Sequence, residues 1–384
     1  MISDFFNFQL STFNFQLSTS NLQLPTNQLK NTFRNKKIFL TGHTGFKGTW
    51  LSIWLQMLGA KVKGYSLEPE KSSLFNKVQS HLKVDSVFAD ILDESRLKKE
   101  IISFQPDFIF HLAAQAIVRE SYNNPIVTFD TNVIGTINVL DSLRYLNKKC
   151  ICVIVTTDKV YENIEKNYAY KETDKLGGYD PYSASKAAAE IVVSSYRLSF
   201  FNPEKYLNHK KSIASARAGN VIGGGDFAVD RIIPDIFRAL SKNRIINVRN
   251  PHAIRPWQHV LEPLNGYLTL AAAMYSNPSK YAQSYNFGPK LKDTSTVKEL
   301  VNFAIQAWGS GTQKTDRNMK APHEAGLLML NINKAGNELG WKPKWSKKKT
   351  IEKTINWYKN SLDKKRNVFE LCENDILDFT RKKN

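Results

Sequence analysis

Residues 36–48, with the sequence KKIFLTGHTGFKG, constrain the fold more than any other stretch of the chain. They predict a short buried strand, then three glycines at intervals of three residues, Gly42, Gly45 and Gly48, and then an apolar helix over Thr49–Leu58. Glycines let the backbone approach phosphate closely, and the free N–H groups and dipole at a helix start stabilise negative charge. The stretch therefore predicts a loop that binds the pyrophosphate of a dinucleotide. A glycine-rich turn without a ligand is the alternative.

The chain from residue 36 onward repeats this alternation of strand-like and helix-like segments. Strands are expected at residues 61–66, 84–89, 108–112 and 151–156, and helices near residues 93–104 and 125–146. Because such alternation requires right-handed crossovers between parallel strands, it predicts a sheet covered by helices on both faces. The predicted fold class is α/β, with a Rossmann-type doubly wound parallel sheet and a smaller C-terminal α/β substrate domain.

Four regions are expected along the chain. Residues 1–35 contain three tandem seven-residue units at 6–26, FNFQLST, FNFQLST and SNLQLPT, whose period-two alternation favours strands. We interpret this region as a poorly ordered extension, with pairing as an edge strand as the alternative. Residues 36–215 are expected to form the dinucleotide-binding domain, to which later segments also contribute. Residues 216–360 are expected mainly to bind substrate, and residues 361–384 to form a basic tail.

The second strong pattern is DPYSASK at residues 180–186. Asp180 at the cap and Pro181 at the first helical position start a helix, on which Tyr182 and Lys186 share one face. A neighbouring ammonium and a bound nicotinamide cation favour the phenolate of a group that otherwise titrates near pH 10. Tyr182 could then take a proton from a substrate hydroxyl while the carbon gives hydride to NAD. A surface Tyr-Lys pair is the alternative, and the glycine loop argues against it.

Together these motifs resemble the extended short-chain dehydrogenase/reductases that act on nucleotide sugars. The resemblance covers about residues 36–360 and is carried by residues 42–48, 112–115, 132–136, 156–163, 177–182, 217–226 and 254–260. Within the family, these stretches are most similar to the CDP-glucose branch of the 4,6-dehydratases. The resemblance implies conversion of CDP-glucose to a 4-dehydro-6-deoxy sugar for deoxysugar and lipopolysaccharide O-antigen synthesis, with NAD restored in each turn.

The resemblance also implies roles for five catalytic residues. Tyr182, assisted by Thr157 and paired with Lys186, would deprotonate the hydroxyl on sugar carbon 4. Elimination of water across carbons 5 and 6 then needs an acid and a base. Related dehydratases carry an Asp-Glu pair after the fifth strand, where this chain has Asp158 and Lys159. Asp158 fits the acid, but Lys159 could be the base only with a lowered pKa, and a substrate-orienting cation is the alternative.

Loops after the predicted strands are expected to contact the cofactor, because ligands of such sheets bind beyond the carboxyl ends of the strands. Glu68 lies slightly late for the acid of a typical NAD site, and no Arg is placed to bind a 2′-phosphate, so NAD is favoured over NADP. Asp90 is expected to bind the adenine amino group, or to cap the following helix. The expected cofactor-binding residues are Gly42, Thr44, Gly45, Phe46, Lys47, Gly48, Ser66, Asp90, Ile91, Leu112, Ala113, Ala114, Gln115, Asn132, Thr156, Tyr182 and Lys186.

Cations and amide donors are expected around the substrate's pyrophosphate and nucleotide. Each Arg could instead serve an ordinary ion pair, and His259 could instead pack in the core. By position in the resembling segments, the expected substrate-binding residues are Gln115, Arg119, Asn220, Arg231, Arg255 and His259.

The net charge of +19 invites a nucleic-acid interpretation. We discount it, because the basic residues are mostly scattered Lys that suit solvated surfaces or an anionic small substrate. No apolar run reaches the roughly 18 residues of a membrane span. Cys150, Cys152 and Cys372 form no metal-ligand set and no even disulfide framework, so no metal and a cytoplasmic location are expected.

Two other functions stay open. A nucleotide-sugar 4-epimerase would share the Tyr182 step, but it has no leaving hydroxyl for Asp158 to protonate. A non-catalytic dinucleotide-binding scaffold would keep the glycine loop and lose the Tyr-Lys pair. The resemblance also implies a homodimer or higher homo-oligomer, paired through residues 125–146 and 181–198.

Overall fold

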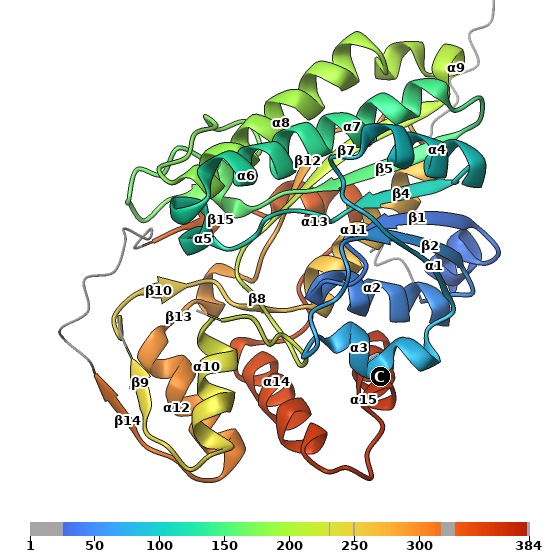
Figure 1. Ribbon diagram of the computed structural model, residues 1–384. Coiled ribbons are helices and arrows are strands. Elements are labelled where there is room, and N and C mark those ends of the chain that lie inside the picture. Colours follow the sequence, from blue (N-terminus) through green and yellow to red (C-terminus); the bar gives the residue numbers. More distant parts are fainter. Residues whose placement is uncertain (1–25, 230, 249, 316–326, 382–384) are drawn as a thin grey trace, which may run out of the picture.

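The computed structural model describes residues 26–229, 231–248, 250–315 and 327–381 (Figure 1). Seven parallel strands form one sheet in the order β12-β7-β5-β4-β1-β2-β3. They are β1 (Lys37–Thr41), β2 (Lys61–Ser66), β3 (Val84–Phe88), β4 (Phe108–His111), β5 (Cys150–Val155), β7 (Lys211–Ala218) and β12 (Ser284–Phe287). The order reverses between β1 and β4, where Thr41 pairs with Tyr65 on one side and His111 on the other. The predicted doubly wound α/β sheet is confirmed.

Helices cover both faces of the sheet because its strands bury side chains on both sides. In β5, Ile151, Val153 and Val155 enter one core and Cys150, Cys152 and Ile154 the other. Helices α4, α7 and α8 complete the second core, and α2 and α11 lie on the opposite face (Figure 1). The helices are α2 (Phe46–Met57), α3 (Leu74–Val78), α4 (Glu94–Phe104), α5 (Val118–Asn123), α6 (Pro125–Phe129), α7 (Gly135–Ser142), α8 (Pro181–Ser199), α9 (Tyr206–His209) and α11 (Leu261–Ser276).

The helix expected over residues 125–146 is continuous to residue 145, but its type of turn changes along its length. Between α6 and α7 lies a π-helical turn, Asp130–Ile134, and the segment ends in a 3-10 turn, Leu143–Tyr145. The π turn carries Asn132, a buried side chain that bonds the loop after β4. Such turns occur often at functional sites, and the turn itself contains no Pro or Gly from which it could have been predicted.

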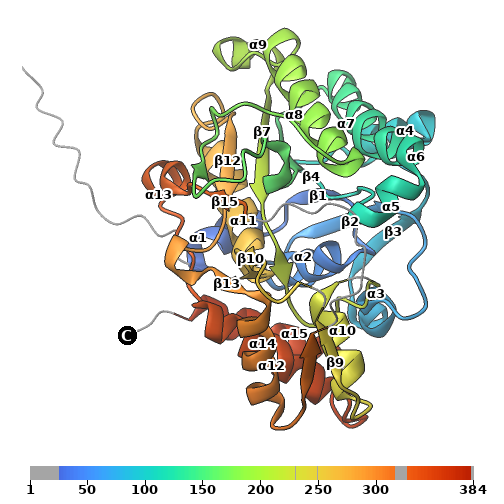
Figure 2. The same ribbon diagram turned by 90° about the vertical axis from the view of Figure 1, so that its left-hand side faces the viewer.

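The remaining elements pair as short two-stranded sheets and pack as small helices. Figure 2 shows β9, α10, α12 and α14 gathered at the end of the molecule away from α7 and α8. The strands pair as β6 (Ala169–Tyr170) with β15 (Met329–Leu330), β8 (Val221–Ile222) with β11 (Gln258–His259), β9 (Ile246–Val248) with β14 (Gln313–Thr315), and β10 (Ile254–Arg255) with β13 (Ser295–Thr296). The helices are α10 (Ile232–Leu240), α12 (Val297–Trp308), α13 (Asn333–Leu339), α14 (Lys347–Ser361) and α15 (Val368–Thr380).

Both terminal regions contain packed helices that the sequence interpretation missed. The seven-residue units lie almost wholly in residues 1–25, outside the described part. The expected extension to residue 35 is wrong, because helix α1 (Thr26–Phe33) buries Leu29 and packs the Phe33 ring against the Phe108 ring, with 4.9 Å between their centroids. The expected tail is also largely a packed helix, α15. Its buried residues, Phe369, Cys372, Ile376 and Phe379, follow the helical period. The Lys and Arg residues on either side of the helix led to the interpretation as a basic tail.

The three cysteines are buried free thiols. Burial raises the pKa of Cys150 to about 12, so this thiol packs in the core rather than reacts. Among the described residues, no group of three or more His, Cys, Asp or Glu side chains could hold a metal ion. No helix in the described ranges is both long enough and apolar enough to cross a membrane.

The buried carboxyl of Glu262 makes stability pH-dependent. It accepts hydrogen bonds from the backbone N–H groups of Lys344 (2.9 Å) and Trp345 (2.7 Å), and burial raises its pKa to about 7. The unfolded carboxyl has its ordinary pKa of 4.5. Between pH 4.5 and 7, the native state therefore holds a proton that the unfolded chain has lost. The raised pKa contributes stability that is fully present below pH 4.5 and is lost as the pH rises through 7.

Glu262→Gln is expected to raise the Tm above that of the parent at pH 8.5 and to match it near pH 5, because it removes only the buried charge. Thermal scans at both pH values measure the difference. Glu352→Gln, on the exposed face of α14, is the control and should show no pH-dependent difference. A lower Tm for Glu262→Gln at both pH values would contradict the assignment.

Candidate active site

The glycine loop joins β1 to α2 through a tight turn. Gly42 has φ +74° and donates its N–H to the Tyr65 carbonyl (2.9 Å), and a Cβ at this position would lie 2.7 Å from the Ala113 nitrogen. A Cβ on Gly48 would overlap the Gly42 carbonyl oxygen. The N-cap residue, Gly45, has no side chain to accept the N–H groups of the first turn of α2. These residues therefore fit an anionic group at the helix start.

Gly48→Ala is expected to weaken dinucleotide binding by at least about tenfold, because the methyl group must push the loop away from Gly42. Titration of the purified protein with NAD, followed by calorimetry, measures the loss. Gly336→Ala on α13 is the control, because its Cβ would meet only the Trp341 carbonyl oxygen at 3.7 Å. Equal NAD affinity for both variants would argue against this loop as the binding site.

Thr44 and Ser66 meet at the carboxyl ends of β1 and β2. Their hydroxyl oxygens lie 2.7 Å apart, and Thr44 also donates to the Leu67 carbonyl (3.1 Å). Asp90 accepts the Leu92 N–H (2.9 Å), while Asp93 caps α4. The alternative of Asp90 as the helix cap is thus excluded, and the adenine contact stays a prediction.

Asn132 on the π turn organises the loop after β4. Its amide accepts the Gln115 N–H (3.0 Å) and donates to the Gln115 carbonyl (3.0 Å) and the Ser185 hydroxyl (2.9 Å). The Gln115 side chain accepts the Ile117 N–H of its own loop and donates to the Thr128 hydroxyl on α6. The structure thus ties the predicted cofactor loop, residues 112–115, to the start of α8.

Helix α8 begins as predicted. Asp180 caps it by accepting the Ser183 N–H (2.9 Å), and Pro181 is the first helical residue. Tyr182 hydrogen-bonds to Thr157, and the Lys186 Nζ donates to the Val155 carbonyl at the end of β5 (3.0 Å). The predicted Tyr-Lys pair therefore faces the end of β5 and is not a surface pair.

The five predicted catalytic residues converge at this point. The buried Asp158 accepts a hydrogen bond from Thr157 Oγ1 (3.0 Å) and forms an ion pair with Lys159 Nζ (3.4 Å). Its other carboxylate oxygen packs against Gly219, where a Cβ would approach it to 2.8 Å. Asp158 is thus held between the ends of β5 and β7, one residue from the partner of Tyr182.

Electrostatics at the site bear on the two roles left open for Lys159. Lys159 could be a base only with a lowered pKa, yet its pKa is raised: burial lowers it, and the Asp158 carboxylate and the Tyr182 phenol outweigh burial. Burial also raises the pKa of Tyr182, against the opposing effects of Lys159 and the Thr157 hydrogen bond. Lys159 is therefore a cation here, which favours the orienting role.

Two further lysines lie in the same positive surroundings. Burial lowers the pKa of Lys186 to about 8, and burial together with Arg231 and Lys186 lowers the pKa of Lys47 to about 8. Like charges crowd here because the glycine loop, the end of β5, α8 and the start of α10 each contribute a cation. Such a cluster is suited to an anionic ligand, which would relieve the repulsion.

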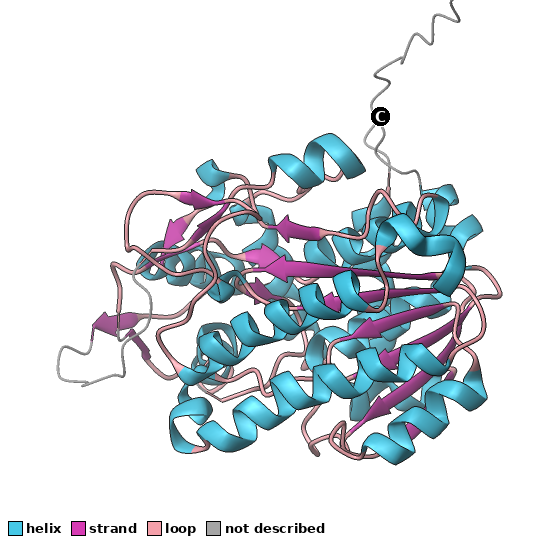
Figure 3. Ribbon diagram, turned by 90° about the horizontal axis from the view of Figure 1, so that it is seen from above, coloured by secondary structure: helices cyan, strands magenta, loops and turns pink. Residues whose placement is uncertain are grey.

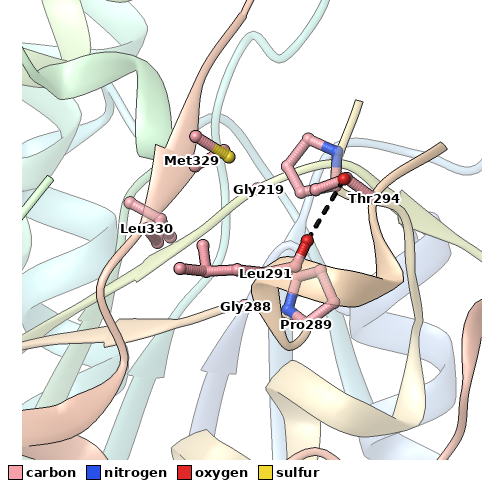
Figure 4. A pocket seen from close by; sticks show the side chains of 8 residues that line it. Gly219, Gly288, Pro289, Leu291, Thr294, Met329 and Leu330 are labelled. Carbon is pink, nitrogen blue, oxygen red and sulfur yellow. Dashed lines mark hydrogen bonds between the residues drawn. The ribbon is translucent and has the colours of Figure 1, made fainter. Parts of the chain in front are cut away.

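A small hollow adjoins Asp158 through Gly219 (Figure 4). The Leu291, Met329 and Leu330 side chains gather on one side of it, and Thr294 bonds the Leu291 carbonyl at its rim (3.2 Å). Two predicted substrate residues, Asn220 and Arg255, are the chain neighbours of lining residues. The lining consists of Gly219, Pro256, Gly288, Pro289, Leu291, Thr294, Met329 and Leu330.

The other predicted substrate residues differ in their surroundings. Arg231 is the N-cap residue of α10, pairs with Asp226 (2.9 Å) and stays about one-third exposed. Arg119 lies in the first turn of α5. The expectation for His259 is wrong: its ring is wholly buried between Trp50 (6.0 Å) and Trp345 (4.7 Å). Burial lowers its pKa to about 3, so it packs as a neutral core residue.

Sequence reasoning missed the buried Glu190–Arg217 pair behind the site. The Glu190 carboxylate accepts the Thr156 hydroxyl (2.6 Å) and the Arg217 guanidinium (2.8 Å). One signal was available: Glu190 is a lone carboxylate four residues after Lys186 in the apolar run AAAEIVV. A charge on the buried face of a helix requires a partner.

Known proteins of two activities resemble the chain. It is 46% identical to CDP-glucose 4,6-dehydratase of Salmonella typhimurium over 331 residues, which cover 86% of this chain and 92% of that protein. It is 24% identical to UDP-glucose 4-epimerase of Mycoplasma genitalium, over 84% of this chain and 96% of that one. The solved dTDP-glucose 4,6-dehydratase of Bacillus anthracis, in complex with NAD, has the same fold, with a TM-score of 0.69, 21% identity and coverage of 86% and 98%. Residues 39–354 match the model of the GDP-mannose 4,6 dehydratase family, and the chain belongs to that family.

Proposed function

We propose that the protein is a hydro-lyase that converts CDP-D-glucose to CDP-4-dehydro-6-deoxy-D-glucose and water, with NAD recycled in each turnover. The observation that carries the proposal is Asp158, buried beside Thr157, Lys159 and the Tyr182 hydroxyl. An oxidation requires only the Tyr-Lys pair, whereas loss of water requires an additional acid at this place. The Salmonella relative, 46% identical, supports the nucleotide and the sugar.

The glycine loop fits the cofactor. The first turn of α2 would hold the pyrophosphate, and Thr44 and Ser66, at the ends of β1 and β2, would face the adenosine ribose. When bound, NAD would supply the carrier for the hydride that leaves sugar carbon 4 and is returned to carbon 6. Lys186, held by the Val155 carbonyl, stabilises negative charge on the Tyr182 oxygen.

Each residue of the site has its own part in the proton transfers. Tyr182 takes the proton of the hydroxyl on carbon 4, and Thr157 holds the phenol oxygen in place. The resulting ketone acidifies the proton on carbon 5. Lys159, which stays charged at neutral pH, stabilises negative charge that develops on the ketone oxygen. The Asp158 carboxylate takes the proton from carbon 5 and passes it to the hydroxyl that leaves carbon 6 as water. The proton held by Tyr182 goes back to carbon 5 when the hydride is delivered to carbon 6.

An anionic substrate suits the charges around the site. Lys47, Arg231 and Arg255 supply cations for a pyrophosphate, and Asn220 supplies an amide near the hollow beside Asp158. The scattered surface charge supports no nucleic-acid partner. The three buried free thiols support a reducing cytoplasm as the location, where the product would serve deoxysugar and O-antigen synthesis.

We further propose a homodimer through α6, α7 and α8. Figure 3 views the molecule from the side that carries these helices, which lie side by side. Apolar side chains are exposed on them, including Ile126 (75% exposed), Ile191 (60%) and Leu198 (62%). Pairing of two copies across this face would bury them in a four-helix interface.

Ile191→Lys is expected to shift the protein toward a monomer, because a charge in the centre of that interface costs desolvation without a partner. Light scattering after size-exclusion chromatography measures the mass. Leu207→Lys on α9, where Leu207 is 83% exposed, is the matched control and should leave the assembly unchanged. A parent protein that elutes as a monomer would refute the dimer.

The activity is tested by incubating the purified protein with NAD and, separately, with CDP-, UDP-, GDP- and TDP-hexoses. Mass spectrometry of the products is expected to show loss of one water from CDP-glucose alone. Dehydration of another nucleotide sugar would refute the CDP assignment. An unchanged mass with a new sugar epimer would indicate a 4-epimerase, and no reaction with any sugar would favour a non-catalytic scaffold.

A further inference from the structure

A buried polar network lies behind the Tyr-Lys pair, and Glu190 is its centre. One carboxylate oxygen accepts the Thr156 hydroxyl (2.6 Å), and the other accepts the Ser215 hydroxyl and the Arg217 guanidinium (both 2.8 Å). Ser284 Oγ lies 3.4 Å from the same oxygen. Four donors, from β7, β12 and the residue that follows β5, thus converge on one side chain of α8, and their number fixes its position.

Glu190 is placed to act on the site through two routes. It lies one helical turn after Lys186, so the two side chains share a face of α8. It also holds Thr156, which stands between Val155, the acceptor of the Lys186 ammonium, and Thr157, the partner of Tyr182. Tyr182 and Lys186 therefore each contact a residue next to Thr156, which Glu190 holds in place.

We propose that Glu190 is a positioning residue that keeps the Lys186 ammonium charged and holds the Thr156–Thr157 segment against Tyr182. This role rests on the proposed function, in which Tyr182 takes the proton of the substrate. The carboxylate does not touch substrate or cofactor; it acts through its neighbours.

The charges around Lys186 make a carboxylate necessary. Burial lowers the pKa of Lys186, and Glu190 opposes that shift. The other ionisable groups near Lys186 give no such help: His111 on β4 is neutral because burial lowers its pKa to about 3, and Lys47 in the glycine loop is a cation. Without the Glu190 charge, the amine would lose its proton at a lower pH.

Arg217 and Arg197 are the charged groups that face Glu190 itself. The pKa of Glu190 is lowered: burial raises it, but Arg217 and the hydroxyl donors outweigh burial, so the carboxylate stays ionised. Arg217 also donates to the Tyr161 hydroxyl (2.8 Å). Removal of Glu190 alone would leave this guanidinium buried without its anion, and that would lower stability whatever the role of Glu190 in the site.

The experiment therefore compares Glu190→Gln with the double variant Glu190→Gln/Arg217→Gln, in which the Arg217 guanidinium is removed together with the carboxylate that pairs with it. The Lys186 amine is titrated by NMR in protein labelled with 13C at the lysine ε carbon, and Lys186→Arg identifies its signal. No substrate is needed. The midpoint for Lys186 is expected to fall by at least about one pH unit in both variants. Ser284→Ala, which removes one donor and keeps the carboxylate, should leave the midpoint unchanged.

A second readout follows the reaction. Reduced nicotinamide is measured at 340 nm in a single turnover with CDP-glucose, and the alkaline limb of the rate profile is expected to move to lower pH in the double variant. An unchanged Lys186 midpoint in a folded double variant overturns the positioning role. A parent protein that reacts with no nucleotide sugar refutes the proposed function instead, and the NMR titration still decides the role of Glu190.

Discussion

Tyr182→Phe is expected to lower the rate of the first oxidation by about 1,000-fold, the size of effect typical for loss of a positioned general base. The phenol oxygen is the only atom removed. The ring keeps its place at the start of α8, and Thr157 keeps its bond to Asp158. Single-turnover mixing with CDP-glucose, followed at 340 nm, measures the step.

The matched control is Tyr196→Phe, a second tyrosine on α8, whose ring packs on Phe200 at 5.1 Å. Its rate should equal that of the parent. The thermal midpoint of Tyr182→Phe should stay within a few degrees of the parent, because one hydrogen bond contributes only about 1 kcal/mol. Normal turnover by Tyr182→Phe would show that another group takes the proton.

Asp158→Asn is expected to separate oxidation from elimination. The amide oxygen can still accept from Thr157 and Lys159, so the site keeps its shape, but an amide cannot protonate the hydroxyl that leaves carbon 6. Elimination should slow by about 100-fold or more, while oxidation continues. The 4-keto hexose with its 6-hydroxyl should therefore accumulate.

Mass spectrometry of the quenched mixture identifies that species, because it is lighter than the substrate by two hydrogens rather than by one water. Asp174→Asn is the control: its carboxylate caps a loop by accepting the Lys171 N–H (2.8 Å) and lies outside the cluster. A variant that eliminates water at the parental rate would remove Asp158 from the acid role. Absence of any keto species, with elimination blocked, would refute the order of the steps.

The central strands β1, β4 and β5 could be predicted because they are buried along almost their whole length and have continuous apolar sequences. Strand β2 has the predicted bounds, and the other predicted strands differ from their predicted bounds by one residue, at one end or at both. Continuous apolar runs and the glycine loop are local signals, and the Asp180 cap is a local signal as well. The start of α8, which local chemistry decides, was predicted correctly.

The role left open for Lys159 and the error at His259 both concern properties that depend on distant neighbours. The protonation of Lys159 is decided by Asp158 and Tyr182 together, and Tyr182 comes from another element. The burial of His259 depends on Trp50 and Trp345, which lie far away in the sequence. Neither can be inferred from spacing along the chain, because the same sequence pattern fits a site wall and a core equally well.

The packing of α15 on α2 has a consequence for synthesis of the protein. Helix α2 carries the glycine loop at its start, and its Trp54 meets Phe379 edge to face at 5.9 Å. One of the earliest helices made is therefore covered by one of the last. A nascent chain exposes the apolar back of α2 until α15 has been made, and chains truncated before α15 would carry an aggregation-prone surface.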